Sequence, residues 1–191
     1  LTVCTKSSFL YPLNDWVDAN IYFTIGKGVL AGKVPFVDLH DQKGPLVYFL
    51  YAIAALISDT SFIGVYVLEA LSFATFLYFS YKLVGLYVED NAFLAVPVLG
   101  ALVLSAMSIS HGGSLEEFCL APFMYSLYRL MRYFRTEAAD GMPYEDVLLN
   151  GALAGCILWC KFNLLAFYLA WMAMLFFAEV AQKRTRRAFV S

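Results

Sequence analysis

The sequence predicts an all-α polytopic membrane protein, on the basis of its composition, its long apolar stretches and the placement of its basic residues. Of its 191 residues, 61% are hydrophobic, 17% are aromatic and 15% are charged. This composition supplies too little polar surface to cover a soluble globule of the same length. We therefore expect an integral membrane protein that contacts membrane lipids and has no nucleic-acid partner.

Several apolar stretches approach the ~20 residues that a helix needs to cross a bilayer. Five such stretches are residues 62–81, 92–110, 116–135, 144–161 and 163–182. The apolar segment at residues 45–57 is shorter. At ~1.5 Å per residue it would reach only ~20 Å, so we expect a half-helix or a buried surface helix.

Basic residues gather at alternate ends of the expected spans, which places them on one side of the membrane. They are Lys82, Arg129, Arg132, Arg135, Lys183, Arg184, Arg186 and Arg187. An excess of lysine and arginine marks the cytoplasmic side. The expected organisation is an outer segment at residues 1–61, five membrane helices at 62–182 and a basic cytoplasmic tail at 183–191. We expect further helices upstream and downstream, because the outer segment needs a preceding span to carry it across.

A run of charged residues stands directly before the short apolar helix, in the sequence VDLHDQKGPLVYFLYAIAAL at residues 37–56. Pro45 suits the first position of a helix, where its missing N–H costs nothing. A helix N-terminus beside Lys43 would form an anion site, and at a membrane surface the anion would be a lipid phosphate. Alternatively, Lys43 extends toward the interface or pairs with Asp38 or Asp41.

Residues 14–36 read as an amphipathic helix that lies on the bilayer. Its apolar residues recur at helical spacing: Ile21, Tyr22, Ile25 and Val29. Asp18 and Tyr22 are four residues apart and therefore share a face. Asp18 could then be held against the membrane surface, or it could serve as a helix cap or dipole partner.

The second outer loop carries two adjacent carboxylates, Glu116 and Glu117, within SHGGSLEEF. Ser114 and Glu117 have the spacing of a capping box, in which each side chain binds the other's backbone N–H. We therefore favour Glu116 for the functional site and Glu117 for the cap.

Two further ionisable residues lie within or beside the expected spans. Glu69 is deep enough in its span to need a partner or a water-filled cavity, so it either lines the site or bonds to neighbouring helices. Lys161, near the outer mouth between two spans, is either a phosphate contact or an interfacial anchor.

A divalent metal site is the competing chemistry for the outer residues. Histidine and carboxylate ligands for zinc or manganese are available in His40, Asp41, His111 and Glu116. These residues include no pair at the i, i+4 spacing of helical ligands. We therefore expect no cofactor and keep the metal as the minor alternative.

Two outer-segment motifs, DANIY at residues 18–22 and GKVPFVDLHDQKGPL at 32–46, resemble the first outer loop of polyprenyl-phosphate-sugar glycosyltransferases of the GT-C superfamily. That superfamily includes protein O-mannosyltransferases and the bacterial aminoarabinose transferases of lipid A. The resemblance implies a GT-C-like helical bundle in the bacterial cytoplasmic membrane with its active site outside. It also implies inverting sugar transfer from a polyprenyl phosphate to a cell-envelope glycan, lipid or protein.

The resemblance implies a catalytic role for Asp18 and contact of Lys43 with the donor phosphate. The chain departs from the family pattern at Ala19, where an acidic residue is common, and at Gly44, where the family has a second proline. The candidate catalytic residues are Asp18 and Glu116. The candidate substrate-binding residues are Lys43, Tyr22, Asp38, Asp41 and Glu117.

Non-catalytic functions are the alternatives to sugar transfer. A polyprenyl-lipid-binding or flippase-like protein would need Lys43 to hold the phosphate but would not need Asp18. A secondary transporter would carry ionisable residues across several spans and broken helices near the bilayer midplane. Only Glu69 is clearly within a span, which argues against the transporter.

Overall fold

The computed structural model describes residues 1–88, 90, 92–137 and 141–182, and every regular element among them is helical. The all-α prediction is therefore confirmed for this part of the chain. The elements are α1 (Val17–Leu30), α2 (Pro45–Ile57), α3 (Ile63–Val84), α4 (Ala92–Leu104), α5 (Met107–His111), α6 (Leu115–Arg132), the π-helix η1 (Tyr133–Glu137), α7 (Tyr144–Cys160), the 3-10 helix η2 (Phe162–Leu165) and α8 (Ala166–Ala181).

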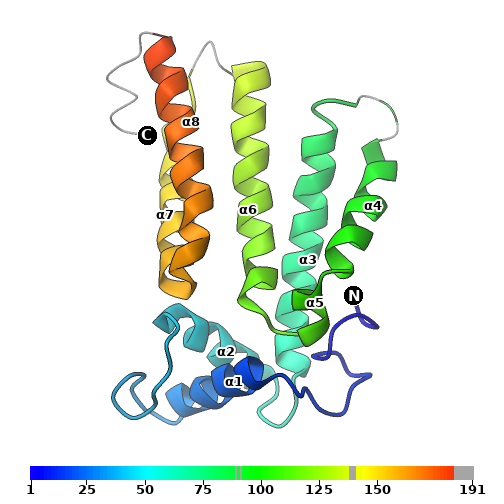
Figure 1. Ribbon diagram of the computed structural model, residues 1–191, viewed down its shortest axis with the longest axis vertical. Coiled ribbons are helices and arrows are strands. Elements are labelled where there is room, and N and C mark those ends of the chain that lie inside the picture. Colours follow the sequence, from blue (N-terminus) through cyan, green and yellow to red (C-terminus); the bar gives the residue numbers. More distant parts are fainter. Residues whose placement is uncertain (89, 91, 138–140, 183–191) are drawn as a thin grey trace.

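The long helices stand side by side, and two shorter helices lie across one end of them (Figure 1). In the upright group, α3 packs on α6 and on α4, while α6 also contacts α7 and α8. The transverse pair consists of α1 and α2, which pack on each other. Of the helix expected over residues 14–36, Val17–Leu30 is helical, and the short helix expected over residues 45–57 is present with those bounds. Their placement at a membrane surface remains a prediction.

Two helical segments of the described chain are long and apolar enough to cross a membrane, Ile63–Val84 and Phe162–Ala181. Helices α2 and α4 are apolar but shorter, with 13 residues each. These lengths and compositions are consistent with membrane association. The five-span organisation remains a prediction.

The prediction of one continuous helix over residues 92–110 is wrong. Helix α4 ends at Leu104, and α5 begins at Met107 after an extended Ala106 with φ −71° and ψ 140°. At the break, the Ser105 hydroxyl donates to the Leu102 carbonyl over 2.7 Å. Serine hydroxyls compete in this way for backbone acceptors that would otherwise continue the helix.

The predicted basic side corresponds to one end of the bundle. The C-terminal ends of α3 and α6 lie at the end opposite the α1–α2 pair (Figure 1). At that end Arg129 forms an ion pair with Asp146 of α7, and Lys82 lies over the Tyr78 ring at 5.6 Å. The predicted tail residues Lys183, Arg184, Arg186 and Arg187 lie outside the described residues.

A buried carboxylate near the basic end was missed by the sequence reading. Glu179 of α8 is only 2% exposed. It accepts hydrogen bonds from the Tyr133 hydroxyl over 3.0 Å and from the Met142 N–H over 3.4 Å. These bonds satisfy the buried Glu179 Oε1 and hold η1 and the following loop against α8.

The core beneath the transverse helices is formed by one cluster of buried side chains: Tyr22, Phe23, Ile25, Val47, Tyr48, Tyr51, Ala54, Ala55, Val65 and Leu115. Ile21, predicted to be on the apolar stripe of α1, is 36% exposed instead. The two helices approach closely at Gly26, where an added Cβ would lie 2.7 Å from the Ala52 nitrogen. Burial of this cluster therefore fixes α1 on α2 and positions the functional residues of both.

Gly44 is expected to be intolerant of alanine, because its backbone lies against the end of α7. Its N–H donates to the Cys160 carbonyl over 3.3 Å, and an added Cβ would lie 1.8 Å from the Trp159 carbonyl oxygen. We expect Gly44→Ala to cost about 1–3 kcal/mol of stability, the usual range for overpacking. Thermal unfolding of the purified full-length protein in detergent measures the loss.

The matched control is Gly155→Ala in α7, where an added Cβ meets nothing within 4 Å. Alanine in a helix interior is favoured over glycine by roughly 0.5–1 kcal/mol, so this variant should unfold at or above the wild-type temperature. Equal unfolding temperatures for the two variants would contradict the close approach at Gly44.

Candidate functional site

The carboxylate of Asp18 lies at the start of α1 and is held there by Tyr22. The Tyr22 hydroxyl donates to Asp18 Oδ2 over 3.2 Å, which confirms the predicted shared face. Burial raises the pKa of the Tyr22 phenol above its ordinary value, and the charge of Asp18 raises it further. Tyr22 therefore stays protonated and serves as a donor that orients Asp18.

Asp18 and Tyr22 line a cavity of about 220 Å³ at the α1–α2 end of the molecule. Its other lining residues come from the segment before α1, from α5, from the start of α6 and from the end of α7: Trp16, Met107, Ser108, His111, Ser114, Leu115, Glu116 and Lys161. The Trp16 and His111 rings stack with their centroids 5.0 Å apart. We call this space the carboxylate cavity because both candidate catalytic carboxylates line it.

Lys161 and Glu116 form an ion pair at the wall of the carboxylate cavity. Helix α7 ends at Cys160, and Lys161 itself is extended with φ −153°. Its side chain is 27% exposed and that of Glu116 is 40% exposed. The sequence predicts Lys161 as either a phosphate contact or an interfacial anchor, but a partner 45 residues away has no local signal in the sequence.

A second cavity, of about 410 Å³, lies between the start of α2 and the end of α7. It is lined by Gln42, Lys43, Gly44, Leu158, Cys160, Lys161, Phe162 and Asn163. We call it the lysine cavity, since Lys43 and Lys161 are its two cations. Lys161 also lines the carboxylate cavity, so the two spaces adjoin at this residue.

The start of α2 has the predicted geometry. Pro45 is the first helical residue, and Gly44 precedes it in an extended conformation with φ −67° and ψ 153°. Lys43 therefore stands next to the first turn of α2, where Pro45 has no N–H and the Val47 N–H donates to the Gly44 carbonyl over 3.3 Å. What this turn offers an anion is the positive end of the helix dipole. A lysine and a helix N-terminus together favour an anion in the lysine cavity.

Asp41 and Asp38 support the loop before α2, and the described ion pairs join neither of them to Lys43. The Tyr48 hydroxyl donates to Asp41 Oδ2 and lies equally close, at 3.1 Å, to the Lys43 carbonyl oxygen. Burial raises the pKa of the Tyr48 phenol, and the charge of Asp41 adds to the rise. Asp38 accepts a hydrogen bond from the Val34 N–H over 2.7 Å, and neither aspartate lines the two cavities.

Glu117 has the structural role that its spacing predicts. The Ser114 hydroxyl accepts from the Glu117 N–H over 3.4 Å, and the Glu117 carboxylate accepts from the Ser114 N–H over 3.3 Å. This is a complete capping box at the start of α6. Glu117 is buried and is absent from the lining of both cavities, whereas its neighbour Glu116 lines one of them.

Glu69 holds the loop that precedes α6. Its carboxylate accepts hydrogen bonds from the Gly113 N–H and, over 3.0 Å, from the Thr5 hydroxyl. Gly112 and Gly113 have φ +73° and +81°, a conformation that side chains rarely adopt. Its carboxyl group is also hydrogen-bonded to that of Glu117 in α6. The partners of Glu69 are thus the outer loop, the N-terminal segment and the neighbouring helix α6 rather than the cavity. In the sequence, the two adjacent glycines indicate a loop with this backbone conformation, because glycine adopts positive φ readily.

The predicted metal ligands are not gathered at one place. The described residues contain no group of three or more His, Cys, Asp or Glu side chains that could hold a metal ion. His111 and Glu116 line the carboxylate cavity, whereas His40 lines a separate surface hollow with Asp15.

Comparison with protein-family profiles, with curated proteins and with solved structures finds no match for this chain.

Taken chemically, the two cavities offer different groups to a ligand. The carboxylate cavity offers Asp18, which can accept a proton from a hydroxyl placed within about 3 Å of it. The lysine cavity offers Lys43 and the N-terminus of α2, which favour a phosphate, while Lys161 in its wall is paired with Glu116. A phosphate-bearing molecule in the lysine cavity and a hydroxyl-bearing molecule in the carboxylate cavity would meet at Lys161.

Proposed function

We propose that this chain forms part of a GT-C-like inverting glycosyltransferase of the bacterial cytoplasmic membrane. The enzyme moves a sugar from a polyprenyl phosphate to a cell-envelope glycan, lipid or protein on the outer face. The observation that carries the proposal is the pair of adjoining cavities, one with the carboxylate of Asp18 and the other with Lys43 at the start of α2.

The lysine cavity is the proposed site of the donor phosphate. Apolar side chains along α2, which begins at this cavity, are exposed: Phe49 is 49%, Ile53 52% and Leu56 71% exposed. A polyprenyl chain can lie along these side chains in the bilayer while its phosphate meets Lys43. The transverse position of α1 and α2 across one end of the bundle suits a substrate that enters from the membrane surface (Figure 1).

The proposed reaction is a single displacement at the anomeric carbon. The acceptor hydroxyl oxygen forms a bond to this carbon as the bond to the phosphate oxygen breaks, and the phosphate leaves with the electron pair. Asp18 takes the hydroxyl proton, oriented by its hydrogen bond from Tyr22. Lys43, Lys161 and the positive end of the α2 dipole stabilise the negative charge on the departing polyprenyl phosphate.

Glu116 has a supporting role in this scheme through its ion pair with Lys161. The pair holds the lysine at the boundary of the two cavities, where it can face the phosphate. Because the ion pair is partly exposed, it adds little to the stability of the fold, and its contribution is to position Lys161. The scheme uses Asp18 as the base and requires no metal ion.

A non-catalytic lipid binder is the second candidate, and the exposed apolar side chains of α2 favour it equally. Such a protein would use Lys43 and the start of α2 to hold a polyprenyl phosphate. It would leave the sugar on the lipid and have no use for the proton acceptor Asp18.

The deciding experiment is a transfer assay with the full-length protein in lipid nanodiscs. The donor is a polyprenyl phosphate that carries a radiolabelled sugar, and cell-envelope extract supplies the acceptor. We expect label in the extract and release of unglycosylated polyprenyl phosphate in equal amounts. Donor binding with no loss of sugar from the lipid would overturn the transferase and favour the lipid binder.

A further inference from the structure

A third cavity opens on the opposite face of α1 from Asp18. It has a volume of about 390 Å³, within the roughly 300–1,000 Å³ typical of small-molecule sites. Its α1 residues are Asn20, Phe23 and Lys27, whereas Asp18 and Tyr22 line the carboxylate cavity. At about 100° per residue, these two sets point to opposite sides of the helix.

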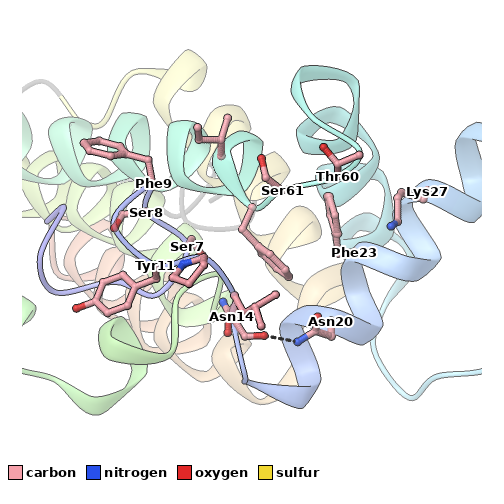
Figure 2. A pocket seen from close by; sticks show the side chains of 14 residues that line it. Ser7, Ser8, Phe9, Tyr11, Asn14, Asn20, Phe23, Lys27, Thr60 and Ser61 are labelled. Carbon is pink, nitrogen blue, oxygen red and sulfur yellow. Dashed lines mark hydrogen bonds between the residues drawn. The ribbon is translucent and has the colours of Figure 1, made fainter.

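Three segments supply the walls, as Figure 2 shows. The N-terminal segment contributes residues 7–9 and 11–14, α1 contributes the three residues named above, and residues 60–63 close the far side at the start of α3. Because these segments are distant in the sequence, the cavity is a product of the tertiary fold. We call it the α1 back cavity.

The walls combine neutral polar groups with aromatic rings. The hydroxyl and amide side chains are those of Ser7, Ser8, Tyr11, Asn14, Asn20, Thr60 and Ser61, and the rings are those of Phe9, Tyr11, Phe23 and Phe62. Among the described lining residues Lys27 is the one cation, and no carboxylate occurs. Hydroxyls and amides both donate and accept hydrogen bonds, so this lining suits a neutral ligand rich in hydroxyl groups.

The hydrogen bonds within the wall leave groups for such a ligand. Both amide hydrogens of Asn20 are used, since Nδ2 donates to the Asn14 carbonyl over 2.8 Å and to the Trp16 carbonyl over 2.9 Å. Its Oδ1 therefore remains as an acceptor. Lys27 lies 4.8 Å from the centroid of the Phe23 ring and donates to the Asp59 carbonyl over 3.3 Å, so one of its three ammonium hydrogens is used.

The back cavity and the carboxylate cavity lie on either side of the segment that leads into α1. Asn14 lines the first and Trp16 lines the second. Asn14 Nδ2 donates to the Gly112 carbonyl over 3.0 Å, next to His111 of the carboxylate cavity. The walls of the two cavities therefore share the segment at residues 14–16.

We infer that the α1 back cavity binds a sugar unit of the acceptor, away from the hydroxyl that is glycosylated. The apolar faces of a sugar ring pack on the aromatic wall, and its hydroxyls bond to Asn20, Lys27 and the serine and threonine side chains. This inference rests on the proposed function for the identity of the sugar as acceptor. To the proposed function it adds a binding site for a second sugar residue, which an acceptor of more than one sugar residue would occupy.

The test uses the full-length protein in nanodiscs and two disaccharide probes, N,N′-diacetylchitobiose and maltose. Saturation-transfer difference NMR measures their dissociation constants. Thr60→Trp places a large ring at the cavity wall from an exposed loop position and should raise the dissociation constant of the better probe about ten-fold or more. Lys27→Met keeps the aliphatic stem over Phe23 but removes the donor, and should raise it roughly two- to ten-fold.

Val37→Trp is the matched control, because Val37 is 71% exposed and does not line the cavity. Its dissociation constant should equal that of the wild type. The inference is overturned if neither probe binds, or if Thr60→Trp binds as tightly as Val37→Trp. If either outcome is found while sugar transfer is normal, the sugar site is refuted and the proposed enzyme is retained. The expected binding pattern in a protein that transfers no sugar would refute the enzyme but retain the sugar site.

Discussion

Asp18→Asn is expected to reduce sugar transfer by roughly 10²–10⁴-fold while donor binding is retained. Asparagine keeps the shape of the side chain, and its carbonyl oxygen can still accept the hydrogen bond that Tyr22 donates to Asp18 over 3.2 Å. It cannot accept a proton from the acceptor hydroxyl. Binding and turnover should therefore separate, which can be measured by equilibrium donor binding and single-turnover transfer on the same preparation.

The matched control is Asp15→Asn, three residues before Asp18. Asp15 has a side chain 73% exposed and pairs with Lys6 over 2.6 Å at the surface. Exposed ion pairs of this kind contribute little, so transfer by this variant should equal that of the wild type. A folded Asp18→Asn protein with normal transfer would remove the proposed base and make Glu116, the other carboxylate of the same cavity, the next residue to replace.

Lys43→Ala is expected to weaken binding of the polyprenyl-phosphate sugar about ten- to a hundred-fold. A hydrogen bond to a charged group contributes roughly 1.5–3 kcal/mol, which corresponds to this range of affinity. The truncation leaves the N-terminus of α2 and Lys161 in the lysine cavity, so binding should weaken rather than vanish. Donor affinity can be measured by titration of labelled lipid into nanodiscs that hold the full-length protein.

Lys33→Ala is the control for this effect, because Lys33 is an exposed lysine of the loop between α1 and α2 and does not line the lysine cavity. It tests whether any loop lysine attracts the anionic lipid. Equal losses in the two variants would indicate general charge attraction. Unchanged affinity in Lys43→Ala would place the donor phosphate elsewhere and remove the main support for the proposed donor site.

The sequence by itself determined the features that depend on neighbouring positions along a helix. The Asp18–Tyr22 hydrogen bond, the capping box of Ser114 and Glu117 and the helix start at Pro45 all follow from spacings of four residues or fewer. Such contacts form whenever the local helix forms, so residue type and spacing are sufficient to predict them. The all-helical character follows equally from the apolar stretches.

Only the tertiary structure decided which distant side chains meet. Lys161 pairs with Glu116 across 45 residues, and Glu69 reaches Gly113 across 44. The sequence could mark these residues as polar groups in apolar surroundings that need partners, but many partners satisfy that need equally well. Packing of α1 on α2, and of α6 beside α7 and α3, selects among them. The same packing creates the two adjoining cavities and the α1 back cavity, because a cavity is a space between segments and has no local pattern in the chain.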